Sequence, residues 1–253
     1  MKKQQYEEIQ WYQFDILDTY PEIIHGSFLR HGGVSSGPFT SLNVGYDLGD
    51  EATNVAKNRQ RITEALGGEF NLHDAVQVHG TTVQTITGIS PEIIPECDAL
   101  MTNVPGHALM IKHADCQAAI FYDPKNKAIA AVHSGWRGSI QNIYKQTIQA
   151  MTKRYNTEPS DLIVGIGPSL GPSASEFTNY KLELPEVLWD FRIDDTHFDF
   201  WEIARSQLRD CGVMPDNVEV ASICTHDNPE DFFSYRREKT TGRHATLVAI
   251  SSS

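Results

Sequence analysis

Three side chains of types that often bind metal ions lie within or at the ends of apolar runs. His79 lies near the end of AVQVHG, Cys116 lies between apolar runs in KHADCQAAIFYD, and His133 ends AIAAVH. Imidazole nitrogen and thiolate sulfur are preferred ligands of Zn²⁺, and a site with three protein ligands keeps a fourth position open. The separations are far longer than those of a zinc finger, so the fold would have to bring the three residues together. Their spacing alone leaves a metal site as a hypothesis.

The same atoms permit a second kind of site, a nucleophile with its base. A Cys116 thiolate paired with His133 would form a catalytic dyad, and Asp115 or another polar group would orient the imidazole. Strand alternation places Asp115 on the face opposite Cys116, unless a turn or bulge interrupts the strand. Taken singly, a cysteine is most often a small buried side chain. The metal content of the protein would separate the two kinds of site.

The residues that follow His133 are typical of a ligand-binding junction between a strand and a helix. The segment HSGWRG places Trp136 and Arg137 between two glycines. At such a junction, side chains and free backbone N–H groups of the helix start converge on a ligand. Arg137 is therefore a candidate for binding an anion, whereas Trp136 either stacks on a substrate or fills the core.

The elements that must position these residues are short strands mixed with a few helices. Several strands are apolar at successive positions, as is typical of strands covered on both faces. Because the order is no regular alternation of strand and helix, we predict an α/β (α+β) fold, layered α/β/α with a mixed β-sheet, in a single domain over 1–253. The predicted strands are 75–80, 82–87, 108–112, 118–123, 128–133, 162–167, 218–224 and 246–250. The predicted helices begin at Asp50, Ser139 and Asp199, with Gly67 and Gly212 beyond the ends of the first and third.

The composition excludes several classes of protein. The 253 residues are 40% hydrophobic and 21% charged, as in ordinary globular domains, and the net charge of −12 disfavours nucleic-acid and anionic-membrane partners. The N-terminus lacks the apolar segment of a secretory signal, and no apolar run approaches the roughly 20 residues that span a bilayer. Four scattered cysteines form no CxxC pair. We therefore expect a cytoplasmic protein with free thiols.

Eight ordered motifs give the sequence a close resemblance to one family. They are FLRHGGVSSGPFTSLNVGYDLGD, NR at 58–59, QVHG, CDALMT, ADC, AAVHSGWRG, VGIGPSL and FFSYRRE…TGRHATLVAI, between about His25 and Ile250. In these motifs the chain resembles the laccase-domain family, also called the YfiH-type, polyphenol-oxidase or peptidoglycan-editing-factor family. The sequence departs slightly from the family pattern at two places. The family usually has a proline shortly after ADC, whereas this chain has QAAI there, and Ser134 stands where alanine is commoner. Neither departure touches a ligand.

The resemblance implies a YfiH-like fold and a Zn²⁺ site formed by His79, Cys116 and His133. It also implies phosphorolysis of adenosine, inosine, guanosine and methylthioadenosine, together with deamination of adenosine. The expected partners are then a purine nucleoside and phosphate. Older family labels imply copper-dependent oxidation of phenols, and bacterial members are linked to the editing of peptidoglycan peptides.

Several residues are candidates for this nucleoside chemistry. A carboxylate must move protons during deamination, and Asp115 is the nearest in the sequence. Phosphate is bound by arginine and by helix N-termini, and Arg137 lies beside a helix start. Asn43 is a candidate for a hydrogen bond to ribose or base, and Trp136 for stacking on the purine. The other candidates for phosphate or substrate binding are Arg59, Arg236, Arg237 and Arg243.

Three alternatives remain open from the sequence. A peptidoglycan-precursor editing hydrolase would use Cys116 as its nucleophile and would work without metal. A non-enzymatic zinc-stabilised module would close the site with a fourth protein ligand. A copper oxidase suits a His₂Cys set, but multicopper oxidation needs further histidine-rich sites, and the chain has no HxH pair.

Overall fold

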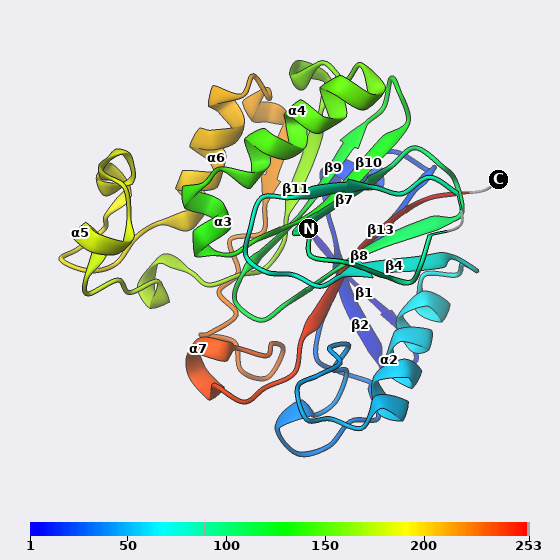
Figure 1. Ribbon diagram of the computed structural model, residues 1–253. Coiled ribbons are helices and arrows are strands. Elements are labelled where there is room, and N and C mark those ends of the chain that lie inside the picture. The colour runs from blue at the N-terminus through cyan, green and yellow to red at the C-terminus, as the bar shows by residue number, and fades with distance from the viewer. Residues whose placement is uncertain (89, 252–253) are drawn as a thin grey trace.

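The computed structural model describes residues 1–88 and 90–251, which form two mixed β-sheets covered by helices (Figure 1). The seven-stranded sheet has the order β1 (Lys2–Tyr6), β2 (Ile9–Gln13), β3 (Ile23–Phe28), β13 (His244–Ile250), β8 (His107–His113), β4 (Asn71–Ala75) and β6 (Ile93–Ile94). The six-stranded sheet has the order β12 (Val218–Val220), β11 (Ile163–Ile166), β9 (Gln117–Asp123), β10 (Ala128–Ser134), β7 (Ala99–Thr102) and β5 (Val83–Thr85). Parallel and antiparallel pairs occur in both sheets.

Helices cover the outer face of each sheet, so the molecule has four layers. The longer helices are α2 (Ala52–Ala65), α4 (Ile143–Tyr155) and α6 (Phe200–Asp210). In Figure 1, α2 lies beside the seven-stranded sheet, while α4 and α6 lie on the side of the six-stranded sheet. The short helices are α1 (Asp15–Asp18), α3 (Trp136–Ile140), α5 (Tyr180–Glu183) and α7 (Tyr235–Glu238), with 3₁₀ turns at Gly37–Phe39, Pro159–Asp161, Pro172–Ala174, Glu186–Phe191 and Pro215–Asn217. None of the helices in residues 1–88 and 90–251 is long and apolar enough to cross a bilayer.

The side-chain alternation of strand β9 shows why both of its faces are apolar. Ile120 and Tyr122 point into the core between the two sheets, whereas Ala119 and Phe121 point into the core under α4 and α6. All seven residues of β9 are buried. Each buried side chain of this size contributes roughly 1.5–3 kcal/mol relative to an exposed one. The prediction of strands covered on both faces is confirmed here.

The mixed sheet predicted from the sequence is divided into two sheets. Strand-length apolar runs give no sign of which sheet they join, because a strand buried on both faces has the same pattern in either. The predicted strand 75–80 is wrong beyond Ala75, where β4 ends. Strand 218–224 ends at Val220, and 82–87 shortens to β5. Strands β1, β2, β3, β6 and β7 were not predicted from the sequence.

The predicted helices are present, with changes at their starts. Helix α2 has Glu51 rather than Asp50 at its N-cap, and Gly67 follows its end with a positive φ of 72°. The predicted helix 139–155 is interrupted between α3 and α4, because Asn142 adopts the left-handed conformation and its side chain caps α4. Asp199 caps α6 as predicted, accepting hydrogen bonds from two backbone N–H groups.

Candidate functional site

Three ligand-type side chains meet near the end of strand β10. His79 lies in the loop after β4, Cys116 in the turn between β8 and β9, and His133 near the end of β10. Their ligand atoms all lie within 4.8 Å of one another. Cys116 Sγ is 3.8 Å from His79 Nε2, and the two imidazole rings lie 4.9 Å apart, nearly perpendicular. The fold thus brings together the three residues expected to bind a metal.

A buried carboxylate, Asp98, is bonded both to His133 and to the loop that carries His79. Its Oδ1 lies 2.8 Å from His133 Nδ1 and accepts a hydrogen bond from the His79 backbone N–H at 2.9 Å. Its Oδ2 accepts hydrogen bonds from the backbone N–H groups of Gly80 and Val78. With Nδ1 bonded to the carboxylate, Nε2 is the ring atom of His133 that would bind a metal once its proton is lost, which is the usual arrangement of metal-binding histidines.

The bonds to Asp98 explain why residues 76–80 form a loop. Three backbone N–H groups that would join a strand ladder donate to one carboxylate instead. His79 also has a positive φ of 59°, which a regular strand does not allow. Asp98 is a functional residue of this site that was not predicted from the sequence. The available signal was an acidic residue in CDALMT, directly before an apolar run.

Gly135 permits the close approach of the three elements. A Cβ atom at this position would lie 2.4 Å from His79 Cδ2 and 3.3 Å from Cys116 Sγ. The φ of Gly135 is −73°, which any residue can adopt. The glycine is therefore required by space beside the cluster and not by backbone conformation.

The titratable groups of the cluster strongly shift one another's pKa values. Burial raises the pKa of the Cys116 thiol, but the nearby His133 and His79 outweigh this effect and lower the pKa to about 6. Burial lowers the pKa of His133, yet Cys116 and Asp98 together raise it to about 9. Burial also raises the pKa of Asp98, while the bonds from His133, Gly80 and Val78 bring it below its usual range. Near neutral pH the group therefore holds a Cys116 thiolate beside a protonated His133, and a metal ion would take the place of that proton.

Asp115 lies in a turn that breaks the expected strand alternation. Its φ is 87°, and the two residues Asp115 and Cys116 line the same cavity. Its carboxylate accepts hydrogen bonds from the Thr225 hydroxyl at 2.7 Å and from the Arg236 backbone N–H at 2.6 Å. The turn that would remove the expected opposition of Asp115 to Cys116 is therefore present.

Two cavities adjoin the cluster, and both reach His79, Cys116 and Tyr235. The first, which we call the aromatic cavity, has a volume of about 240 Å³. Its apolar walls are formed by Trp136, Leu170, Phe177 and Phe200, with Asp115, Gln117, Ser134, Ser175 and Arg236 as polar groups. The second, the polar cavity, has a volume of about 550 Å³. Its charged groups are Asp47, Arg59, Asp74, Lys112 and Arg243, beside His113 and His133.

The cations of the polar cavity differ in how they are bonded. Arg59 is buried and donates to Asp74, to Glu92 and to a backbone carbonyl. Lys112 also donates to Asp74. The guanidinium of Arg243 donates only through Nη1, to the carbonyls of Thr241 and Gly242, in the hydrogen bonds that the structure describes. Arg243 is therefore the cation of this cavity with the most donor capacity left for an anion.

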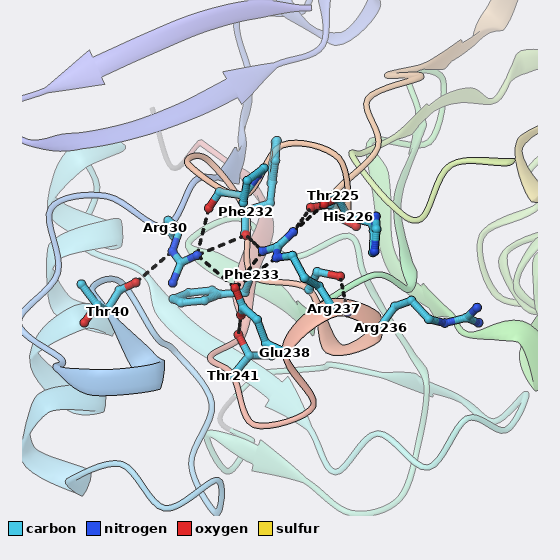
Figure 2. Close-up of polar contacts among 12 residues, drawn as sticks. Arg30, Thr40, Thr225, His226, Phe232, Phe233, Arg236, Arg237, Glu238 and Thr241 are labelled. Carbon is cyan, nitrogen blue, oxygen red and sulfur yellow. Dashed lines mark hydrogen bonds and ion pairs between the residues drawn. The ribbon is translucent and has the colours of Figure 1, made fainter. Parts of the chain in front are cut away.

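The other predicted arginines lie elsewhere. Arg137 is exposed, lies over the Trp136 ring at 5.2 Å and lines neither cavity. Arg236 lines the aromatic cavity, although its guanidinium donates to the carbonyls of Ala174 and Glu176. Arg237 is bonded to carbonyls of its own segment (Figure 2).

Of the two remaining candidates, only Trp136 reaches a cavity. Its ring lies in the wall of the aromatic cavity, edge-on to Phe177 at 6.0 Å. Asn43 is buried, and its side chain bonds to Gly45, Asp50 and the Arg243 backbone N–H. It holds the chain at Arg243 and lines neither cavity. Lys112, which lines the polar cavity, was not selected from the sequence.

The chain matches known proteins over almost its whole length. The family model described as multi-copper polyphenol oxidoreductase laccase matches residues 24–251. The chain is 34% identical over 244 residues to a protein of Bacteroides thetaiotaomicron named purine nucleoside phosphorylase, covering 88% of this chain and 90% of the relative. It is 32% identical over 229 residues to purine nucleoside phosphorylase YfiH of Escherichia coli, covering 88% and 91%. The crystal structure of YlmD from Geobacillus stearothermophilus has a TM-score of 0.88 at 29% identity, covering 98% of both chains. The predicted mixed α/β fold is confirmed by this likeness.

Proposed function

Because the chain belongs to the multi-copper polyphenol oxidoreductase laccase family, and similar proteins are named purine nucleoside phosphorylases, we propose that it is a purine nucleoside phosphorylase. The observation that carries the proposal is the junction of two unlike cavities at one cluster. The aromatic cavity suits a flat purine, and the polar cavity suits phosphate. Both reach His79 and Cys116, so the two reactants would meet there.

The cluster itself fits a Zn²⁺ ion, which is the metal of this proposal. Zn–N bonds of about 2.0 Å and Zn–S bonds of about 2.3 Å at tetrahedral angles place ligand atoms roughly 3.5 Å apart. The distance of 3.8 Å between Cys116 Sγ and His79 Nε2 is close to this value. The carboxylate of Asp98 behind His133 supplies the expected support for a ligand. A bound Zn²⁺ would supply Lewis-acid chemistry at the junction.

We assign the purine to the aromatic cavity. Trp136, Phe177 and Phe200 offer ring faces and edges, which bind flat heteroaromatic groups without demanding one pattern of hydrogen bonds. The side-chain amide of Gln117 is held by hydrogen bonds to the Phe200 carbonyl and the Tyr144 hydroxyl, so it is a fixed polar group in the cavity wall. This mixture is consistent with adenosine, inosine, guanosine and methylthioadenosine as substrates.

Phosphate is assigned to Arg243 in the polar cavity. A guanidinium with unused N–H groups binds phosphate oxygens through charge-assisted hydrogen bonds. In phosphorolysis, a phosphate oxygen forms a bond to C1′ of the ribose as the C1′–N9 bond breaks, and the departing purine takes up a proton. The chain's task is to align these two reactants at C1′ and to exclude water.

Product analysis tests the proposal. Purified protein with bound zinc is incubated with inosine and phosphate, and hypoxanthine and ribose 1-phosphate are quantified. Stoichiometric formation of both products, dependent on phosphate, is expected. Absence of turnover by zinc-replete protein on any of the four nucleosides, with Cys116→Ala indistinguishable from the unaltered chain, would contradict the proposal.

The proposal extends to deamination of adenosine and to a cytoplasmic location. Deamination is tested separately, because it forms inosine and ammonia without phosphate.

Copper in place of zinc would favour phenol oxidation, since a His₂Cys set also suits copper. Elemental analysis of protein purified without added metal distinguishes the two ions.

One observation favours a second candidate, the peptidoglycan-precursor hydrolase. The lowered pKa of Cys116 beside His133 also suits a nucleophile with its base. That function predicts activity that survives chelation and covalent trapping of Cys116 by a substrate analogue. Loss of activity on chelation, restored by Zn²⁺, supports the phosphorylase instead.

A further inference from the structure

The residue next to Cys116 is fixed by three hydrogen bonds from other parts of the chain. The carbonyl of Asp115 accepts from the Leu170 backbone N–H at 2.8 Å. Its carboxylate oxygens accept from Thr225 and from the Arg236 backbone N–H. With a φ of 87°, the backbone at Asp115 departs from the extended conformation of a strand immediately before the thiol. The direction of the Cys116 side chain therefore depends on how Asp115 is held.

Two of these three donors belong to the segment 225–241, which includes α7. Figure 2 shows the guanidinium of Arg237 at the centre of this segment, bonded to the carbonyls of Thr225, His226 and Phe232. Glu238 accepts from Arg237 and from Thr241. Hydrogen bonds from Arg237 thus hold the two ends of this segment together.

A second arginine ties the same segment to the seven-stranded sheet. Arg30, just beyond β3, donates to the carbonyls of Thr40 and Pro229 (Figure 2 shows the bond to Thr40), and its guanidinium lies 4.5 Å from the Phe233 ring centroid. The segment is therefore bonded both to Arg30 beyond β3 and to Asp115.

The same segment forms part of the cavity walls. Tyr235 lines both cavities and is 51% exposed, and Arg236 lines the aromatic cavity. The bonds to Asp115 therefore join the wall that would contact the substrate to the turn that carries the proposed thiolate ligand.

We propose that Asp115 is a positioning residue, which couples the segment 225–241 to Cys116, and that it does not carry protons in the reaction. The metal part of this inference rests on the proposed site, and the turnover part rests on the proposed function. It replaces the proton-transfer role expected for Asp115 from the sequence.

Four variants separate positioning from proton transfer. Asp115→Asn keeps an oxygen for the Arg236 N–H and an amide beside the Thr225 hydroxyl, but it cannot act as an acid or base. Asp115→Ala removes both bonds. Thr225→Val removes one bond at constant volume in a buried position, and Thr225→Ser keeps the hydroxyl as its matched control.

The first measurement is titration of metal-free protein with Co²⁺, followed by the thiolate-to-cobalt absorption band. Loss of a supporting hydrogen bond behind a ligand typically weakens metal binding about 10- to 100-fold. We expect this loss, with a shifted band, in Asp115→Ala and Thr225→Val. Asp115→Asn and Thr225→Ser should stay within about threefold of the unaltered chain, because their hydrogen bonds are kept. Thermal unfolding of the metal-free proteins shows that each variant is folded.

The second measurement is phosphorolysis by the zinc-loaded variants. Asp115→Asn should retain kcat within about threefold, whereas Thr225→Val should raise KM for the nucleoside as the wall shifts. Loss of turnover in Asp115→Asn with a normal cobalt band would overturn the proposal in favour of proton transfer. Unchanged cobalt binding in both Asp115→Ala and Thr225→Val would also overturn it. An inactive unaltered chain whose cobalt titrations follow the expected order would refute the proposed function and still support the coupling.

Discussion

The imidazole of His133 and the carboxylate of Asp98 form a fully buried pair, with Nδ1 of the histidine 2.8 Å from Oδ1 of the aspartate. The same carboxylate binds three backbone N–H groups of the loop that carries His79. One side chain therefore sets the position of two of the three proposed ligands.

The change Asp98→Asn should weaken Zn²⁺ binding about 10- to 100-fold. An asparagine presents an amide N–H₂ group where the structure places N–H donors on both carboxylate oxygens, so one set of donors would face another. Competition titration with a chelator dye measures the affinity. Asp123→Asn is the matched control, because Asp123 is also buried and caps a turn, at Lys125 and Asn126. Equal affinity in Asp98→Asn and the control would contradict the prediction.

The change Gly135→Ala should disrupt the cluster without straining the backbone. The new methyl group would lie 2.4 Å from His79 Cδ2, so the imidazole must leave its present position in the cluster. We expect Zn²⁺ affinity to fall at least about tenfold, as for other displaced ligands, while metal-free protein unfolds at nearly the same temperature. Gly80→Ala is the control, since its methyl group would meet Asp98 Oδ2 at an ordinary 3.5 Å. A cobalt spectrum unchanged by Gly135→Ala would show that the cluster tolerates the methyl group.

The change Arg243→Ala should raise KM for phosphate more than KM for the nucleoside. A charge-assisted hydrogen bond is worth about 1.5–3 kcal/mol, which corresponds to about a 10- to 100-fold loss of kcat/KM for phosphate. Arg137→Ala serves as the comparison, because Arg137 is exposed and lines neither cavity. Steady-state kinetics at varied phosphate measures both. A larger increase in KM for phosphate in Arg137→Ala would contradict this prediction and would place the phosphate site at the helix start, as expected from the sequence.

The three residues of the cluster could be selected from the sequence as proposed ligands, whereas the residues that support them could not. His79, Cys116 and His133 have side chains with specific chemistry beside apolar runs, so residue type and local pattern select them. Asp98 is 35 residues from His133 in the sequence, and its role exists only because β7 and β10 pair side by side. Gly135 is likewise explained only by the distance to His79.

The fold shows the same division between local and non-local information. Capping by Asp199 and the stop at Gly67 depend on neighbouring residues and were predicted. The hairpin of β1 and β2 was not, because the strand KKQQY is polar and largely exposed at a sheet edge. The break at Asn142 was hidden by helical spacing that continues on both sides of it.

The last prediction concerns the pH dependence of stability, through a buried histidine that is not part of the cluster. His25 is buried, and its Nε2 accepts a hydrogen bond from the Phe14 backbone N–H at 2.9 Å, so the neutral ring is required. Burial lowers its pKa from 6.5 to about 4. Between these two values the unfolded chain binds more protons than the folded chain, so stability is complete above about pH 6.5 and falls as the pH decreases toward 4. By pH 5 the loss from this group should be about 2 kcal/mol. In urea unfolding with a chelator at pH 7.5, 6 and 5, His25→Gln should show a flatter dependence, since glutamine offers an oxygen to Phe14 and does not titrate. Parallel curves for the two proteins would show that His25 is not the titrating group.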